Sequence, residues 1–123
     1  MKTGWEYSLD GQNYTPVSLP CRVKNLPPDS TVFLRTVLKD DYPHPALLVK
    51  GEHQKMVISL GPEEIFSSET FYPTNTRNPG LYKPIVYLPV DYLNKELTIA
   101  ISSPYPFFQG SLNNVYIGRN STL

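Results

Sequence analysis

The feature that most constrains the fold of this chain is an alternation of apolar and polar side chains with a period of two residues. In residues 96–103 every second side chain is apolar: Leu97, Ile99 and Ile101. Side chains along a β-strand point alternately to the two faces of a sheet, so this pattern predicts a strand with one buried face. Residues 31–39 form the longest β-rich run and carry apolar side chains at both parities. We therefore expect residues 31–39 to be a central strand covered on both sides.

Turn residues divide the rest of the chain into short pieces. Thirteen prolines are spread over 123 residues, and no segment offers three convincing helical turns. The spacing of apolar segments and turns is typical of a β-sandwich or barrel. Further strands are expected at residues 5–9, 16–20, 21–26, 46–50, 55–60, 81–88 and 114–119. Residues 16–20 begin and end with proline and suit a sheet edge, residues 46–50 and 55–60 are expected to pair as a hairpin, and residues 90–95 are compatible with one helical turn.

Length and composition indicate a single folded domain over residues 1–123. Hydrophobic residues make up 40% of the chain, which is too many for a disordered tail. Eleven basic and eleven acidic side chains cancel without any basic cluster, so we expect no nucleic-acid partner. Cys21 is the single cysteine, which excludes an intramolecular disulfide and leaves the redox compartment open. No apolar run approaches the roughly 20 residues that span a bilayer, so the chain itself is expected to be soluble.

Two stretches resemble a known kind of module. The first comprises "GWEYSLDGQNYTPVSLP" (residues 4–20) and "STVFLRTVLKD" (residues 30–40), and the second is "PIVYLPVDYLNKELTIAISSPYPFFQGSLNNVYIG" (residues 84–118). Together they are similar to the galactose-binding-like jelly-roll domains at the outer, N-terminal end of bacterial membrane receptors. In such receptors a multi-helix membrane region and a diguanylate cyclase or histidine kinase domain follow. The resemblance implies a jelly-roll β-sandwich of about eight antiparallel strands.

The sequence carries no recognisable catalytic pattern. A nucleophilic Cys21 would need an oriented histidine, and neither His44 nor His53 stands in a known signature. The adjacent carboxylate pairs at residues 40–41 and 63–64 would point to opposite faces of an extended strand, so neither makes a convergent acid/base site. We therefore expect a protein that is not an enzyme and that has no catalytic residues, metal site or cofactor.

Aromatic and arginine side chains are the candidate binding residues. Aromatic faces on loops can stack on sugar rings, and a guanidinium group can hold a carboxylate or hydroxyl groups. For Tyr72 and Tyr105 the alternative of capping the open end of a sandwich stays open, and capping is favoured for Phe107 and Phe108. The candidate ligand-binding set is Arg35, Tyr72, Arg77, Tyr82 and Tyr105.

The resemblance leads us to expect the extracytoplasmic sensor domain of a bacterial membrane signalling protein, excised from a longer chain. Its ligand would be a small molecule such as a carbohydrate, or a partner protein, and a membrane would be reached only through the rest of that longer chain. Two alternatives stay open. The chain can be a carbohydrate-binding accessory module of a secreted glycoside hydrolase, or a structural or dimerisation spacer.

Overall fold

The chain folds as an all-β domain. The computed structural model describes residues 4–24, 26–27, 30–52, 54–68, 81–103 and 110–119. Within these ranges there are thirteen strand segments, compared with the eight or so expected, because several are only two or three residues long. They are β1 (Trp5–Ser8), β2 (Thr15–Val17), β3 (Cys21–Arg22), β4 (Thr31–Val37), β5 (Pro45–Leu48), β6 (Gly51–Glu52), β7 (Lys55–Leu60), β8 (Glu63–Ser67), β9 (Leu81–Tyr82), β10 (Ile85–Tyr87), β11 (Glu96–Ser102), β12 (Ser111–Leu112) and β13 (Tyr116–Arg119).

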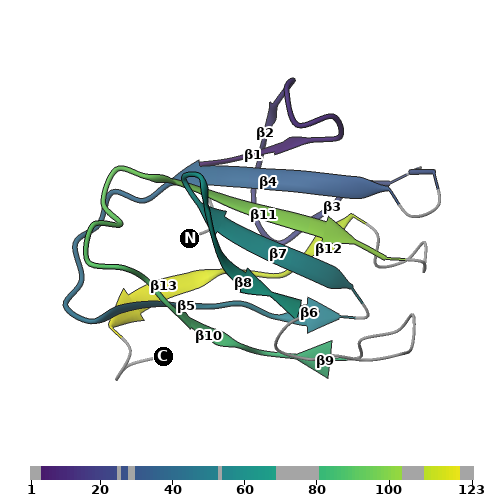
Figure 1. The fold of residues 1–123 in the computed structure, drawn as a ribbon. Helices are drawn as coiled ribbons and strands as arrows, with labels where there is room; N and C mark the ends of the chain where they lie inside the picture. Colours follow the sequence, from purple (N-terminus) through teal and green to yellow (C-terminus); the bar gives the residue numbers. More distant parts are fainter. Residues whose placement is uncertain are drawn as a thin grey trace.

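The strands form two layers. A six-stranded sheet has the order β2-β1-β4-β11-β7-β8, a three-stranded sheet has the order β10-β5-β13, and two short pairs, β12-β3 and β6-β9, complete the set. All pairings among the described strands are antiparallel. Figure 1 shows the six-stranded sheet lying over the three-stranded one. The prediction of an antiparallel β-sandwich is confirmed, and β2 lies at a sheet edge as its flanking prolines indicated.

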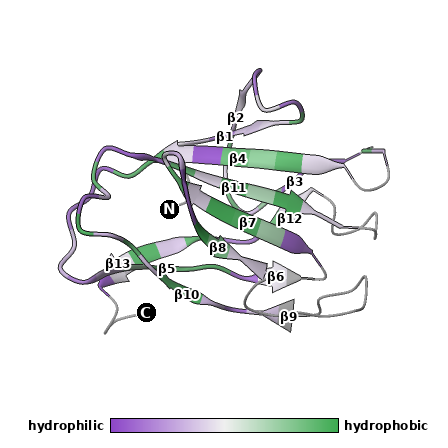
Figure 2. Ribbon diagram, in the orientation of Figure 1, coloured by the Kyte–Doolittle hydropathy of each residue, from purple (hydrophilic) through white to green (hydrophobic). Residues whose placement is uncertain are grey.

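The core lies between the two layers, and the period-two pattern builds it. β11 pairs with β4 along seven positions and with β7 along six. Figure 2 shows the green, hydrophobic positions of these strands interrupted by paler ones. The buried apolar side chains of these three strands are Val32, Leu34, Met56, Ile58, Leu60, Leu97, Ile99 and Ile101. Those of the opposite layer include Leu47, Val49, Val86 and Val115.

The outer face of β4 differs from the prediction. We expected a strand covered on both sides, but Phe33 and Arg35 are only half-buried and Val37 is exposed. No third layer of described strands covers this face. Instead, the ring of Tyr14 stacks on Arg35. Residues 31–39 therefore carry apolar side chains on both faces because one face is deeply buried and the other is partly covered.

The expected hairpin of residues 46–50 and 55–60 is wrong. β5 pairs with β10 and β13 in the smaller sheet, whereas β7 pairs with β11 and β8 in the larger one. Both strands have a buried apolar face, and placing them in opposite layers lets the two faces meet across the core. The hairpin partner of β7 is β8, reached through a turn at Gly61, whose φ of 59° is what a two-residue hairpin turn requires at its first central position.

Two further segments depart from their expected form. Residues 81–88 divide into β9 and β10, separated by Lys83 and Pro84, and the Pro84 carbonyl accepts a hydrogen bond from the Val49 amide at 3.3 Å. Residues 90–95 form turns and no helical turn. The turn positions Tyr92 in the core, where its hydroxyl donates to the Asp40 carbonyl at 2.7 Å and accepts from the Tyr42 amide at 2.8 Å. No helix among the described residues is long and apolar enough to cross a membrane.

A carboxylate organises the loop between β1 and β2. One oxygen of Asp10 accepts hydrogen bonds from the amides of Gln12 and Asn13 at 2.8 and 2.9 Å and from the Ser8 hydroxyl at 2.8 Å. The backbone amides of Asn13 and Gln12, followed by the Ser8 and Asn13 side chains, hold the pKa of Asp10 well below its usual range.

This network predicts a pH-dependent difference between the protein and its Asp10→Asn variant. The depressed pKa means that the ionised carboxylate stabilises the folded state above the unfolded pKa of about 4, and that this contribution is lost as the pH falls below it. We expect the variant to melt at a lower temperature at pH 7 and the difference to shrink towards pH 2. Thermal denaturation followed by circular dichroism measures it, and a pH-independent difference would contradict the assigned role.

Candidate functional site

Three of the five candidate binding residues, Tyr72, Arg77 and Tyr105, lie outside the described residues. The same holds for Phe107 and Phe108, so the choice between binding and capping stays a prediction for these loop aromatics. The other two candidates, Arg35 and Tyr82, are in described strands, and the structure does not bring them together. Arg35 is on the outer face of the six-stranded sheet, whereas Tyr82 belongs to the core cluster.

Arg35 is engaged by its neighbours. Its Nε donates to Glu6 Oε1 at 3.0 Å, and its Nη1 lies 3.9 Å from Glu96 Oε2. The guanidinium carbon lies 3.5 Å from the centroid of the Tyr14 ring. Two carboxylates and one aromatic face therefore surround the guanidinium group, an arrangement that explains Arg35 as a strand-to-strand contact.

Tyr82 has the surroundings of a structural residue. Its side chain is 6% exposed, and its hydroxyl donates to the carbonyl of Gln54 at 2.7 Å. A Cβ atom built on Gly51, the residue paired with Tyr82, would collide with the tyrosine ring, so glycine is needed for the ring to lie there. Tyr82 thus packs in the interior, with its ring against Gly51 of β6.

The structure draws attention to a surface that the sequence did not single out, the outer face of the sheet β10-β5-β13. Ile85 pairs with Leu48, and Leu48 pairs with Tyr116, so these three side chains form one row across the three strands. The next row runs from Tyr87 through Ala46 to Gly118. We call this surface the tyrosine face.

Two lysines extend the tyrosine face on the other side of the Leu48 row. Leu48 pairs with Ile85 and Gly51 pairs with Tyr82, and two residues separate these pairs on each strand. Lys50 and Lys83 therefore stand directly opposite each other, on the same side as Leu48 and Ile85.

A cavity of about 220 Å³ opens where the lysines meet the Leu48 row. We call it the lysine cavity. Its lining combines the two lysines with apolar, aromatic and amide side chains and, among the described residues, contains no acidic one: Leu48, Val49, Lys50, Lys83, Asn113, Asn114 and Tyr116. Tyr116 is 52% exposed, so part of its surface is accessible to a ligand.

Asn114 contributes an unsatisfied acceptor to this region. Its Oδ1 atom is shielded from solvent and has no hydrogen-bond partner. A buried acceptor without a donor costs about 1–3 kcal/mol relative to a satisfied one.

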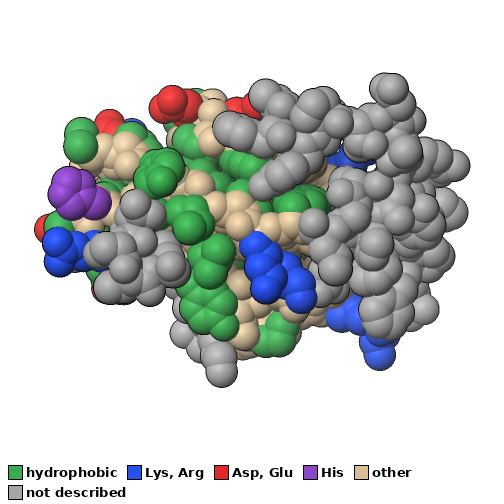
Figure 3. All heavy atoms as spheres, turned by 90° about the horizontal axis from the view of Figure 1, so that it is seen from below, with side chains coloured by type: hydrophobic (Ala, Val, Ile, Leu, Met, Phe, Trp, Pro, Cys, Tyr) green, Lys and Arg blue, Asp and Glu red, His purple; other side chains and the backbone are tan. Residues whose placement is uncertain are grey.

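The tyrosine face also exposes apolar surface. Tyr87 is 67% exposed and Ile85 41%, and a second cavity of about 550 Å³ lies beside Tyr87 with Pro43, His44 and Val90 in its lining. Figure 3 views the molecule from below and shows hydrophobic side chains gathered along this side, with lysine or arginine side chains next to them and acidic ones at the margin. The described part of this side is thus apolar and basic.

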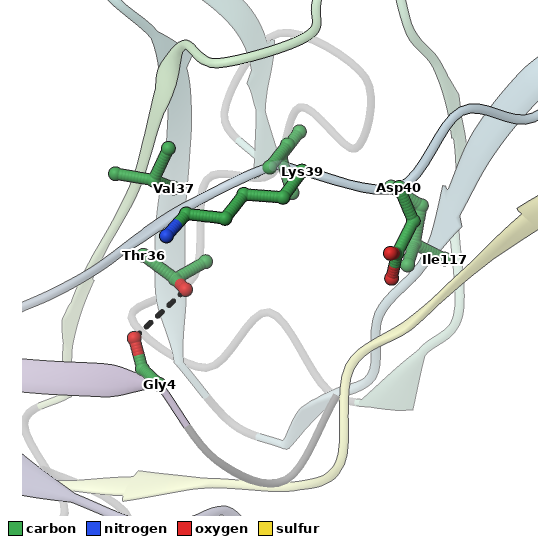
Figure 4. Close-up of a pocket in the computed structure, with 7 residues that line it drawn as sticks. Gly4, Thr36, Val37, Lys39, Asp40 and Ile117 are labelled. Carbon is green, nitrogen blue, oxygen red and sulfur yellow. Dashed lines mark hydrogen bonds between the residues drawn. The ribbon is translucent and has the colours of Figure 1, made fainter.

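A third cavity, of about 440 Å³, lies where β4 ends, near the start of β1 and β13. Figure 4 shows the side chains of Lys39 and Asp40 at this cavity and the Thr36 hydroxyl bonded to the Gly4 carbonyl at 2.8 Å. The lining residues are Gly4, Thr36, Val37, Leu38, Lys39, Asp40 and Ile117. They include no aromatic side chain, and both charge signs are present.

The reactive side chains have no catalytic arrangement in the described residues. Burial raises the pKa of the Cys21 thiol, which disfavours the thiolate that nucleophilic attack requires, and a hydrogen bond to the Leu112 backbone only partly opposes this. His44 is exposed, and His53 lies outside the described residues. No three histidine, cysteine, aspartate or glutamate side chains of the described chain are grouped as metal ligands.

Comparison of the chain with protein-family models, with curated proteins and with solved structures finds no match. The fold and the cavity themselves define the molecule as an antiparallel β-sandwich with a basic cavity, lined in part by Tyr116, on its smaller sheet.

The opposition of the two lysines can be tested by charge reversal. Lys83→Glu places opposite charges across the strands, and we expect it to raise the free energy of unfolding by about 0.2–1 kcal/mol at low salt. Urea denaturation measures the gain, and added salt screens it. The control is Lys83→Glu in a Lys50→Gln background, where the gain in the free energy of unfolding should largely disappear. An undiminished gain there would contradict the opposition of the two lysines.

The unsatisfied acceptor can be tested by an isosteric substitution. Asn114→Leu removes the buried oxygen at nearly constant shape, so we expect the free energy of unfolding to be unchanged or higher. Tyr92→Phe is the contrasting control, because it deletes two observed hydrogen bonds and should lower the stability by about 1–2 kcal/mol. A loss for Asn114→Leu equal to that of Tyr92→Phe would mean that the amide is satisfied in solution.

Proposed function

We propose that the chain is a non-catalytic carbohydrate-binding domain and that the lysine cavity is its binding site. The observation that carries the proposal is the combination, in one cavity on a rigid sheet, of an exposed tyrosine ring, two lysines and two asparagines. Sugars present an apolar C–H face and a rim of hydroxyl groups. An aromatic ring packs against the first, while amide and ammonium groups bond to the second.

The dimensions of the cavity support a small ligand. Its volume of about 220 Å³ is below the roughly 300–1,000 Å³ of sites for drug-sized molecules. One sugar residue of a longer chain suits such a site. Tyr87 and Ile85 extend the same surface beyond the cavity, and further residues of an oligosaccharide would lie along them.

The lining also supports binding without hydrolysis. Glycoside hydrolysis generally uses two carboxyl groups about 5–10 Å apart, one of them a proton donor. The lining of the lysine cavity includes no aspartate, glutamate or histidine among the described residues. Neither of the described reactive groups, Cys21 and His44, belongs to that lining.

The broader role that we propose for this domain is that of a sensor on the outer side of a bacterial membrane. It is supported by the resemblance of residues 4–20, 30–40 and 84–118 to receptor jelly-roll domains and by the sandwich architecture. In such a receptor the bound sugar shifts the equilibrium between two arrangements of the domain and the membrane region by its difference in affinity for them. The accessory module of a glycoside hydrolase would use the same site without this coupling.

Binding is tested by titrating the isotope-labelled protein with neutral and acidic monosaccharides and short oligosaccharides. We expect amide chemical-shift changes to cluster at residues 48–50, 83 and 113–116. Tyr116→Ala should weaken binding at least tenfold by removing the stacking surface. Tyr14→Ala is the matched control, because this tyrosine stacks on Arg35 of the six-stranded sheet, and it should leave the affinity unchanged. Shift changes that cluster instead on the third cavity, around Lys39 and Asp40, or no binding by any sugar, would refute the proposal.

A further inference from the structure

We infer that the third cavity, where β4 ends, is a second binding site and that its ligand is a free amino acid in its zwitterionic form. This inference goes beyond the proposed function and uses none of the residues that line the lysine cavity. The observation behind it is a pair of opposite charges, Lys39 and Asp40, at a cavity of about 440 Å³. That volume lies within the roughly 300–1,000 Å³ that is usual for small-molecule sites.

The third cavity lies at one end of the sandwich and is lined by residues of both layers. The larger sheet contributes Thr36 of β4, and the smaller sheet contributes Ile117 of β13; both strands reach the same end of the molecule (Figure 1). Gly4 lines the cavity next to Thr36, whose hydroxyl donates to the Gly4 carbonyl at 2.8 Å. In Figure 4 the Lys39 nitrogen lies on the side of Thr36 and the Asp40 carboxylate on the side of Ile117. The two charges are therefore at different sides of one opening.

Neither charge is neutralised within the part of the chain that the structure describes. There the side chains of Lys39 and Asp40 make no ion pair and no hydrogen bond, so the two do not neutralise each other although they are neighbours in sequence. A ligand that carries both a carboxylate and an ammonium group can pair with both side chains at once. A ligand of a single charge pairs with one and meets a like charge in the other, so the complementary ligand is a zwitterion.

The backbone that carries the two charges is held on both sides of Lys39. Before it, the Leu38 carbonyl accepts a hydrogen bond from the Asn94 amide at 2.7 Å. After it, the Asp40 carbonyl accepts from the hydroxyl of Tyr92, a buried residue, at 2.7 Å. Both donors belong to the turn that precedes β11. Binding therefore has to order the two side chains and not the backbone, which lowers its entropic cost.

The rest of the lining suits a small aliphatic side chain. Val37 is 43% exposed and Ile117 is half-buried, so both offer apolar surface to a ligand. The described lining holds no aromatic ring on which a sugar or an aromatic side chain could stack, and no charged residue besides Lys39 and Asp40. L-Valine combines the two charges with an aliphatic group and is the probe that we choose.

The inference is tested by titrating the isotope-labelled protein at about pH 6 with L-valine, N-acetyl-L-valine and L-valinamide. Acetylation removes the positive charge of the ligand, and the amide replaces its carboxylate by a neutral group. We expect L-valine to shift the amide signals of residues 36–40 and 117. Each neutralised probe should bind about fivefold more weakly, the upper end of the contribution of an exposed ion pair.

Two variants assign each charge of the ligand to its partner. Lys39→Gln should abolish the difference between L-valine and L-valinamide and keep the difference from N-acetyl-L-valine, and Asp40→Asn should do the reverse. Asp41→Asn is the matched control, because this neighbouring carboxylate is exposed and outside the lining. It should leave all three affinities unchanged. Circular dichroism of each variant verifies that it folds.

Several outcomes would overturn the inference. They are equal affinity for the three probes, no binding of L-valine, and shift changes that cluster away from the third cavity. An effect of Asp41→Asn as large as that of Asp40→Asn would overturn it as well, because overall charge would then explain the result. The sugar titrations report on the lysine cavity, so the proposed function and this inference can each fail without the other.

Discussion

The structure depends on the pairing of β4, β11 and β7 at the centre of the larger sheet. These strands are in register over six or seven positions, so their inward side chains form a continuous apolar surface. Fully burying one such side chain stabilises the fold by about 1.5–3 kcal/mol. Val32, Leu34, Ile58, Ile99 and Ile101 are completely buried there. A chain without a disulfide has to obtain its stability from this interior.

The smaller sheet completes that interior and carries the candidate site on its other side. Leu47 and Val49, in and just after β5, point into the core. Because side chains alternate along an extended chain, Leu48 and Lys50 point outward. The same alternation in residues 83–88 turns Val86 inward and Ile85 and Tyr87 outward. Packing of the core thereby fixes which side chains form the tyrosine face, and a rigid sheet holds them in place for recognition.

The candidate binding residues were chosen from the chemistry of their side chains, because the sequence does not show which residues surround them in the fold. Arg35 was expected to hold a ligand, but in the fold it is bonded to Glu6 from β1 and lies near Glu96 from β11. Tyr82 was also expected to bind a ligand, but in the fold, where β6 pairs with β9, it is buried. The lysine cavity was missed because Lys50 and Lys83 are distant in sequence, and each alone looks like an ordinary solvated charge.

Local patterns in the sequence were enough to predict the all-β class, the edge position of β2 and the buried faces of β7 and β11. Those features follow from local alternation and from proline, whose effects act within a few residues. The tertiary structure alone decided which strands are partners. Alternation specifies a buried face but not the strand beside it, so β5 and β7 read as a hairpin although they belong to opposite layers. The opposition of the two lysines is a consequence of that long-range pairing.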